Sequence, residues 1–370
     1  MNLDCSPLLV FYETTRACLL ACRHCRAEAM PWASPGQLST DEAKRFFEDL
    51  LGFGSHPPVL ILTGGDPLMR PDIFELCSFA SSLGITVALS PSVTPALTTA
   101  NVRRLKDSGV ASVSISLDGA TAATHENVRQ VAGHFAQTMD AVSMLVGEGM
   151  TVQINTTVMK INAGELDAVA AVVKELRAAI WEVFFLIAIG RGTGLEALGA
   201  AGNEDVCHFL YDASCYGFTV RTVEAPFFRR IAAQRRRGGA ADGGPLYRRL
   251  ARGLRDRLGE PTDQPRAQTA GTRDGKGIVF VSHEGDVYPA GFLPLPMGRV
   301  PSESIVDVYR HHPTFVSLRR GDFTGRCGRC EFKDLCGGSR ARAFAASGDA
   351  LAEDPGCSYE PLVGSGLDAG

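Results

Sequence analysis

Short apolar runs rich in β-branched residues alternate with helical stretches from residue 8 to about residue 190. This alternation is typical of repeated βα units around a parallel sheet. The runs predicted as strands are LLVFYE (8–13), VLILT (59–63), TVALS (86–90), SVSIS (112–116), TVQINTTV (151–158) and WEVFFLI (181–187). Six such units predict an α/β fold, a partial (β/α)6 barrel of TIM-like architecture, whose loops after the strands build the active site.

Helix ends between the strands support this interpretation. The run Ser39–Glu42 is a plausible cap for the first helix, and Pro71–Asp72 opens the second. Gly84 and Gly109 stand where the ends of helices favour glycine.

The pattern changes after residue 228, which divides the chain into three parts. We predict the barrel over 1–228, an arginine- and glycine-rich linker or lid, loop-like around one helix, over 229–276, and a cysteine-rich domain over 277–370. The arginines of the middle part either cover a solvated helix face, the commoner outcome, or meet an anionic substrate. In the third part, GIVFVSHEGDVYPAGF predicts two strands joined by a turn at 283–286.

Composition places the chain among ordinary globular proteins. Apolar residues make up 45% of the 370 residues and charged residues 21%, and the formal net charge is −4. A chain with this charge balance lacks the excess of basic residues that favours binding to nucleic acid or to an anionic membrane. The sequence has no apolar run near the ~20 residues that span a bilayer, and it does not open like a secretory signal. We therefore expect a cytoplasmic protein without nucleic-acid or membrane partners.

Seven of the eleven cysteines fall into two groups, which indicates metal or redox chemistry in a reducing compartment. The first group is Cys18, Cys22 and Cys25, and the second is Cys327, Cys330, Cys336 and Cys357. The remaining four, Cys5, Cys77, Cys207 and Cys215, are expected to be small buried hydrophobic residues.

The first group has the spacing CxxxCxxC, which presents three thiolates to one [4Fe-4S] cluster and leaves one iron open for chemistry. A zinc site is the alternative, but zinc normally takes a fourth protein ligand. The second predicted strand ends in Gly64-Gly65-Asp66, a glycine pair whose bare backbone can approach a ligand, followed by a carboxylate.

With these motifs the chain resembles the radical S-adenosylmethionine (SAM) superfamily. The resemblance implies that the three cysteines hold a [4Fe-4S] cluster whose open iron binds SAM, which one electron cleaves to a 5′-deoxyadenosyl radical. It also implies that Gly64, Gly65 and Asp66 occupy the Gly-Gly-Glu position that receives the methionine amino group, with Asp in place of the commoner Glu. His24 stands before the third cysteine, where the family usually has an aromatic residue near the adenine.

Four further positions match the family more weakly. By the same resemblance Ser90 is a ribose contact and Arg129, downstream of an SLDG segment at 116–119, pairs with the SAM carboxylate. Asn155 and Thr157, at alternate positions of one strand, line the barrel near SAM. The alternatives are a strand-ending turn for Ser90, a surface salt bridge for Arg129 and polar core packing for the other two.

The second cysteine group completes four ligands of a cluster that moves electrons, and its surroundings resemble the SPASM domain of the same superfamily. A full SPASM domain has seven cysteines for two auxiliary clusters, but Ala290 and Arg340 stand where cysteines are expected. The resemblance therefore implies one auxiliary [4Fe-4S] cluster, as in tetrapyrrole-modifying members involved in heme and heme d1 formation. A zinc knot is the alternative.

The resemblance predicts an oxidoreductase that abstracts hydrogen from unactivated carbon, and the second cluster favours an oxidative outcome over simple isomerisation. The first substrate prediction is a small-molecule biosynthetic intermediate; the alternatives are a ribosomally made peptide, a tetrapyrrole side chain, and a non-enzymatic electron carrier or sensor. Expected partners are an electron donor such as flavodoxin or ferredoxin and, for a peptide, a separate leader-binding protein. No catalytic acid or base is assigned among the polar groups near strand ends or turns, which are Asp118, His125, Glu224, His283 and Tyr288.

Overall fold

The computed structural model describes residues 2–239, 243–261, 263–268 and 271–362. Its strands form one sheet with the order β11-β10-β9-β1-β2-β3-β4-β5-β6-β7, and β8 pairs with β9. The strands are β1 (Leu9–Glu13), β2 (Val59–Thr63), β3 (Val87–Leu89), β4 (Val110–Ser116), β5 (Thr151–Val158), β6 (Ile180–Phe185), β7 (Thr219–Val223), β8 (Arg273–Asp274), β9 (Gly277–Val281), β10 (Asp286–Tyr288) and β11 (Gly298–Arg299).

The predicted partial barrel is confirmed, with one strand more than expected. All six predicted strands form, and β1 to β7 pair in parallel in chain order. The additional strand is β7, whose sequence TVRTV alternates polar and apolar residues instead of forming an apolar run.

The C-terminal part joins the same sheet. Strand β9 pairs in parallel with β1, with Leu9 opposite Ile278, and β9 and β10 form the predicted antiparallel hairpin. The strands β9, β10 and β11, within residues 277–299, therefore extend the barrel sheet on the side of β1 that faces away from β2.

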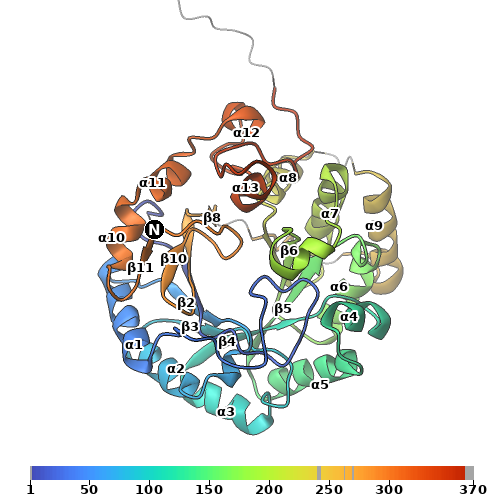
Figure 1. Ribbon diagram of the computed structural model, residues 1–370. Coiled ribbons are helices and arrows are strands. Elements are labelled where there is room, and N and C mark those ends of the chain that lie inside the picture. The colour runs from blue at the N-terminus through green and yellow to red at the C-terminus, as the bar shows by residue number, and fades with distance from the viewer. Residues whose placement is uncertain (1, 240–242, 262, 269–270, 363–370) are drawn as a thin grey trace, which may run out of the picture.

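Helices surround the ring of strands, and the loop after β1, dark blue in Figure 1, lies across its interior. The helices are α1 (Thr40–Asp49), α2 (Ile73–Ser82), α3 (Thr99–Asp107), α4 (Ala122–Arg129), α5 (His134–Gly147), α6 (Leu166–Glu175), α7 (Ala200–Ala213), α8 (Phe228–Arg236), α9 (Pro245–Leu258), α10 (Ile305–His311), α11 (Pro313–Arg320), α12 (Gly325–Arg329) and α13 (Arg340–Ser347). Short 3₁₀ turns are η1 (Leu50–Phe53), η2 (Pro67–Met69), η3 (Ala163–Glu165) and η4 (Gly190–Gly194). In the described ranges no helix is long and apolar enough to cross a membrane.

The two-residue period of the strands separates an inner face from an outer one. On β1, Val10 and Tyr12 are fully buried, and the Tyr12 ring packs edge-on against Phe46 of α1 at 5.6 Å between ring centroids. Leu9 and Phe11 point to the other face and line an internal cavity. The outer face of the strands thus packs against the helices to form the core, and the inner face lines the cavity.

The predicted cap of the first helix is confirmed as a capping box. The Ser39 side chain accepts from the Glu42 backbone N–H, and the Glu42 carboxylate accepts from the Ser39 backbone N–H at 2.8 Å.

The stretch 229–276 differs from the expected loop around one helix. It contains both α8 and α9, and α9 packs against α6 and α7 through Leu250, Ala251 and Leu254. The stretch therefore holds two helices where one was expected, and arginines separate the apolar positions of the amphipathic helix α9.

Candidate active site

A cavity of about 690 Å³ occupies the inside of the barrel. Its wall is polar along β4 to β6 and apolar along β9, β1 and β2. The polar side chains are Ser112, Ser114, Ser116, Gln153, Asn155 and Glu182, and the apolar ones are Leu9, Phe11, Val59, Ile61, Ile278 and Phe280. A molecule that fills this space therefore meets hydrogen-bonding groups on one side and hydrocarbon on the other.

All three cysteines of the first group line this cavity. Cys18 and Cys22 are buried and pack together with Leu20. Donors surround their sulfur atoms, because the Leu20 backbone N–H lies 3.4 Å from Cys18 Sγ and an Arg129 N–H donates to Cys22 Sγ at 3.5 Å. Burial raises the pKa of the Cys18 thiol, so an electropositive iron is the kind of partner that would keep it ionised. The three residues fit a cluster exposed to the cavity.

The glycine pair holds the cysteine loop against the end of β2. A Cβ atom on Gly64 would lie 2.3 Å from the carbonyl oxygen of Thr15, and one on Gly65 would lie 2.3 Å from that of Ala17. The Gly65 N–H donates to the Thr15 carbonyl at 2.7 Å. The bare backbone therefore makes room for another backbone segment, while both glycines also line the cavity.

Asp66 turns its side chain into the wall and does not line the cavity. The carboxylate is fully buried and accepts hydrogen bonds from the Leu68 N–H at 3.1 Å and the Thr94 hydroxyl at 2.8 Å. Burial raises its pKa despite these donors. Asp66 thus begins the 3₁₀ turn η2, and direct binding of SAM by this side chain stays a prediction.

Arg129 is buried, so the alternative of a surface salt bridge is wrong. Its guanidinium lines the cavity and lies 2.7 Å from Asp118 Oδ2. The same carboxylate oxygen lies 2.9 Å from His24 Nε2, and Oδ1 accepts from the Thr157 backbone N–H at 2.8 Å. Although burial opposes ionisation, the charges of Arg129 and His24 hold the pKa of Asp118 well below its usual range.

Asp118 is therefore one of the residues that join the cysteine loop to the barrel. It links His24 of that loop, Arg129 of α4 and the backbone of β5, and the sequence alone assigned it no role. The SLDG segment at 116–119 was the available signal, because it ends a strand with a carboxylate.

The other predicted SAM contacts divide into two kinds. Ser90, Asn155 and His24 line the cavity, and the Ser90 and Ser114 hydroxyls are 2.6 Å apart. Thr157 is not among the lining residues and contributes its backbone N–H to Asp118.

Two unassigned histidines form a buried chain. The Asp118 N–H donates to His125 Nδ1 at 3.1 Å, and His125 Nε2 lies 2.8 Å from His134 Nδ1. Burial lowers the pKa of both, that of His125 to about 3, so they are neutral and serve as wall structure. His283, beside Glu13, and Tyr288 lie outside the set of lining residues.

The four cysteines of the second group line a separate small cavity. Backbone N–H groups point at their sulfur atoms, from Gly338 to Cys336 at 3.5 Å and from Asp354 to Cys327 at 3.4 Å. Burial raises the pKa of Cys336 to about 12. Across the described ranges, no three His, Cys, Asp or Glu side chains close on a single metal ion. Four thiols around one space with donors aimed at them fit a cluster with four thiolate ligands.

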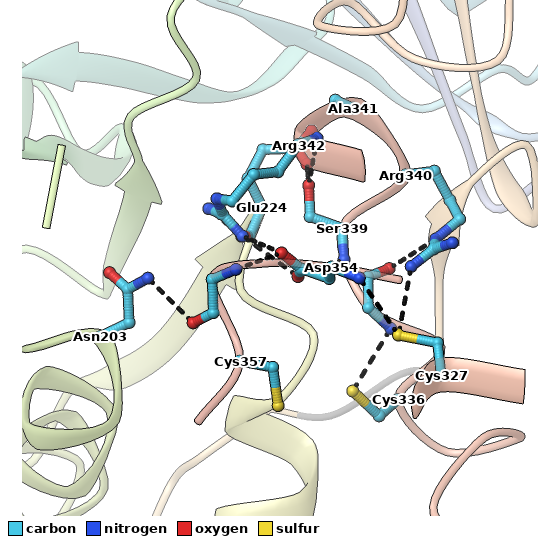
Figure 2. Close-up of polar contacts among 12 residues, drawn as sticks. Asn203, Glu224, Cys327, Cys336, Ser339, Arg340, Ala341, Arg342, Asp354 and Cys357 are labelled. Atoms are coloured by element: carbon cyan, nitrogen blue, oxygen red, sulfur yellow. Dashed lines mark hydrogen bonds and ion pairs between the residues drawn. The ribbon is translucent and has the colours of Figure 1, made fainter. Parts of the chain in front are cut away.

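The two positions where a full SPASM domain has cysteine are filled differently. Figure 2 shows the buried Arg340 reaching Cys327, with 3.6 Å between guanidinium nitrogen and sulfur. Ala290 is buried in an apolar cluster with Leu293 and Leu318.

A pair of buried carboxyl groups, Glu224 and Asp274, lies between this site and the barrel cavity and lines the cavity. The two side chains hydrogen-bond to each other, and Ser339 Oγ donates to Glu224. The backbone N–H groups of Arg340 and Ala341 donate to Asp274 Oδ2, each at 3.0 Å. Burial raises the pKa of both carboxyls, which favours their protonated form.

Comparison with known proteins identifies the family. Residues 12–173 match the Radical SAM superfamily. The chain is 38% identical to an AdoMet-dependent heme synthase of Nitratidesulfovibrio vulgaris over 97% of its own length and 94% of that protein. It is 35% identical to the AdoMet-dependent heme synthase of Methanosarcina barkeri, with 96% of this chain and 97% of that one covered. An Fe-coproporphyrin III synthase of the same organism is 27% identical over 96% of this chain and 88% of that one.

Among solved structures, Streptococcus suis SuiB bound to its precursor peptide SuiA has a TM-score of 0.67. That match covers 96% of this chain and 76% of SuiB at 15% identity, which supports the fold alone. The cysteine loop, the barrel and the full-length relatives agree: the chain belongs to the radical SAM superfamily, whose members bind a [4Fe-4S] cluster and SAM, and it is related along its whole length to AdoMet-dependent heme synthases.

Proposed function

We propose that this protein is a radical SAM enzyme that oxidises the propionate side chains of a heme-type tetrapyrrole. The observation that carries the proposal is the identity of 35 to 38% with heme synthases over nearly the whole chain. Of the substrates left open by the sequence, these relatives favour the tetrapyrrole over the small metabolite that we placed first. Heme carries two vinyl groups where Fe-coproporphyrin III carries propionates, so conversion of propionate to vinyl is the reaction class.

The balance of this reaction defines what the site has to do. Each conversion removes one hydrogen atom from the carbon next to the ring, one electron, and the carboxylate carbon as CO2. When bound at Cys18, Cys22 and Cys25, the cluster and SAM supply a radical able to take hydrogen from unactivated carbon. The protein must hold that carbon close to the radical and keep water away.

The cavity suits such a substrate in volume and polarity. Its volume of about 690 Å³ lies within the usual range of ligand pockets. The apolar wall of β9, β1 and β2 suits the face of a macrocycle, and the polar wall of β4 to β6 suits the adenosine and methionine parts of SAM.

The ion-paired residues next to the cysteine loop keep that loop in place. The Asp118 carboxylate pairs with both Arg129 and His24, and Arg129 also donates a hydrogen bond to Cys22 Sγ. The Arg129 Nε has no partner within the described residues and is free to donate to a SAM carboxylate.

The electron released by the substrate needs an acceptor. We assign this role to a single auxiliary cluster held by Cys327, Cys330, Cys336 and Cys357, which line one space behind the cavity wall. A flavodoxin or ferredoxin completes the proposal as the external electron donor.

Anaerobic assay of the reconstituted protein with SAM, dithionite and Fe-coproporphyrin III tests the proposal. We expect 5′-deoxyadenosine together with tetrapyrrole products that have lost CO2 and two hydrogens per reacted side chain, resolved by mass spectrometry. If 5′-deoxyadenosine forms while the tetrapyrrole stays unchanged, the proposed substrate is wrong. The peptide and the small metabolite would then be the substrates to test.

A further inference from the structure

Arginines of the stretch 229–276 divide into those with acidic partners and those without. The paired ones are Arg230 with Glu204, Arg235 with Asp212, Arg257 with Asp167 and Arg266 with Asp263. Arg229 and Arg273 differ, because both line the barrel cavity and neither has a carboxylate partner within the described residues.

Their present hydrogen bonds are to backbone carbonyl oxygens and leave donors unused. Arg273 bonds to the carbonyl oxygens of Leu318 at 3.3 Å and Asp334 at 3.4 Å, both at the long end of the range, and its Nε has no partner within the described ranges. The side chain stacks on Phe323 and is only 5% exposed. Arg229, on the first turn of α8, donates to the carbonyl oxygens of Thr272 and Leu335.

A guanidinium removed from water without a carboxylate partner is unfavourable in a folded protein, and Arg273 is buried while Arg229 is partly buried. Burial lowers the pKa of Arg229 to about 10 and also lowers that of Arg273. An anion at this wall would remove the penalty, and a planar guanidinium is well suited to a carboxylate.

The anionic groups already present do not account for both arginines. Burial raises the pKa of Glu224 and Asp274, which disfavours their negative charge, and the hydrogen bonds of Arg229 and Arg273 go to backbone carbonyl oxygens instead of to these carboxyls. The thiolates of the second cysteine group have a nearer cation in Arg340, which donates to Cys327 Sγ. The charge of Cys336 also reaches Arg229 and Arg273, but neither arginine hydrogen-bonds to a sulfur atom.

We propose that Arg229 and Arg273 form a binding subsite for a carboxylate of the substrate. This inference rests on the proposed function. The subsite belongs to the same cavity as Cys18, Cys22 and Cys25, and it lies toward the second cysteine group. A substrate anchored there by one carboxylate spans the space between the site of hydrogen abstraction and the site of electron acceptance.

Binding titrations on the reconstituted, unreduced protein test the subsite. The ligands are Fe-coproporphyrin III and its neutral tetramethyl ester, followed by absorbance. We expect Arg229→Gln and Arg273→Gln each to raise Kd for the acid by about tenfold to a hundredfold, the loss typical of one charged hydrogen-bonding pair. The Kd of the ester should stay unchanged, and Arg229→Lys should restore part of the affinity for the acid.

Two controls distinguish the loss of a substrate carboxylate contact from a general loss of binding and from an effect on SAM. Arg257→Gln removes an arginine that Asp167 already pairs, half exposed on the outer face, and should change neither Kd. SAM also has a carboxylate, so its Kd is measured in each variant and should not change. Equal losses for acid and ester, or a loss confined to SAM, would overturn the proposal.

A second measurement uses the wild type and a simpler probe. Phenylglyoxal modifies arginine, and mass spectrometry locates the modified residues. Succinate should protect Arg229 and Arg273 where succinamide does not. The wild type could bind neither porphyrin while succinate still protects the two arginines. In that case the proposed tetrapyrrole substrate is wrong, but the carboxylate subsite is supported. The subsite proposal would be wrong if succinate did not protect Arg229 and Arg273 from phenylglyoxal and neither substitution changed the Kd of the acid.

Discussion

The two cysteine groups differ in the size of the cavity that each one lines. Cys18, Cys22 and Cys25 line the large barrel cavity, whereas Cys327, Cys330, Cys336 and Cys357 line a small space of their own. The first group has three thiols and an adjoining volume that accepts a substrate. The second has four thiols enclosed by backbone N–H groups and Arg340. Under the proposed function, the first group is the site of bond breaking and the second is the site of electron transfer.

The largest effect should come from removing one cysteine of each group. Cys22→Ala should abolish 5′-deoxyadenosine formation, since the cluster that binds SAM loses a ligand. Cys336→Ala should keep 5′-deoxyadenosine formation and lose most of the oxidised product. Liquid chromatography with mass spectrometry measures both compounds in one assay. If both variants lost 5′-deoxyadenosine with full loading of the remaining cluster, the division of roles would be wrong.

A smaller change tests how the first group is positioned. Gly65→Ala puts a Cβ at 2.3 Å from the Ala17 carbonyl oxygen and should displace the cysteine loop, with loss of most of the first cluster. Gly147→Ala is the matched control, because nothing in the described part of the chain lies within 4 Å of its added Cβ. Iron content and electron paramagnetic resonance in a Cys336→Ala background report the first cluster alone. Normal loading in Gly65→Ala would contradict the steric argument.

The ion pairs beneath the cysteine loop should matter less than its backbone. Asp118→Asn leaves Arg129 buried without its carboxylate and should cost about 3–5 kcal/mol of unfolding free energy, as for other broken buried pairs. Arg103→Gln breaks a solvent-screened pair with Glu148 and should cost much less than Asp118→Asn. Anaerobic chemical denaturation measures both. Equal small effects would show that Asp118 does not hold this site together.

The smallest expected effect concerns the carboxyl pair between the two sites. Burial raises the pKa of Glu224 above its ordinary value of 4.5, so the native protein binds more protons than the unfolded chain. Its contribution to stability is therefore largest below that value and declines as pH rises. Glu224→Gln should flatten the fall in unfolding free energy as pH rises above 4.5.

Glu148→Gln is the control for this pH series. That carboxyl is exposed, and the hydrogen bond from Arg103 lowers its pKa, so its removal should leave the fall in place. An unchanged slope in Glu224→Gln would mean that Glu224 does not hold the proton.

The elements that were predicted correctly depend on residues that lie close together in the sequence. The six predicted strands form because β-branched apolar runs bury well on a pleated surface. The capping box needs only Ser39 and Glu42, three residues apart. The strand β7 was missed and only one helix was expected where α8 and α9 both form, because polar residues interrupt the apolar pattern of these elements.

Contacts between distant segments explain what the sequence left open. The glycine pair at 64–65 suggests a close approach to a ligand, and the structure shows that it first admits the backbone of the cysteine loop. The family motif predicts that Asp66 contacts SAM, and only the structure shows that its carboxylate accepts hydrogen bonds from the Ser92 N–H and the Thr94 hydroxyl. Asp118 joins residues from three separate elements, an arrangement that no local pattern contains.

By itself the sequence determined the chemistry, through the number and spacing of the cysteines and the repeat of the βα units. Ligand identity and strand period are properties of short segments, so they can be read without a fold. Only the tertiary structure decided which groups share the cavity, which carboxyls have a raised pKa, and that Arg229 and Arg273 hydrogen-bond to backbone carbonyl oxygens within the described residues. Burial and charge pairing depend on neighbours far apart in the chain, and the fold alone brings those neighbours together.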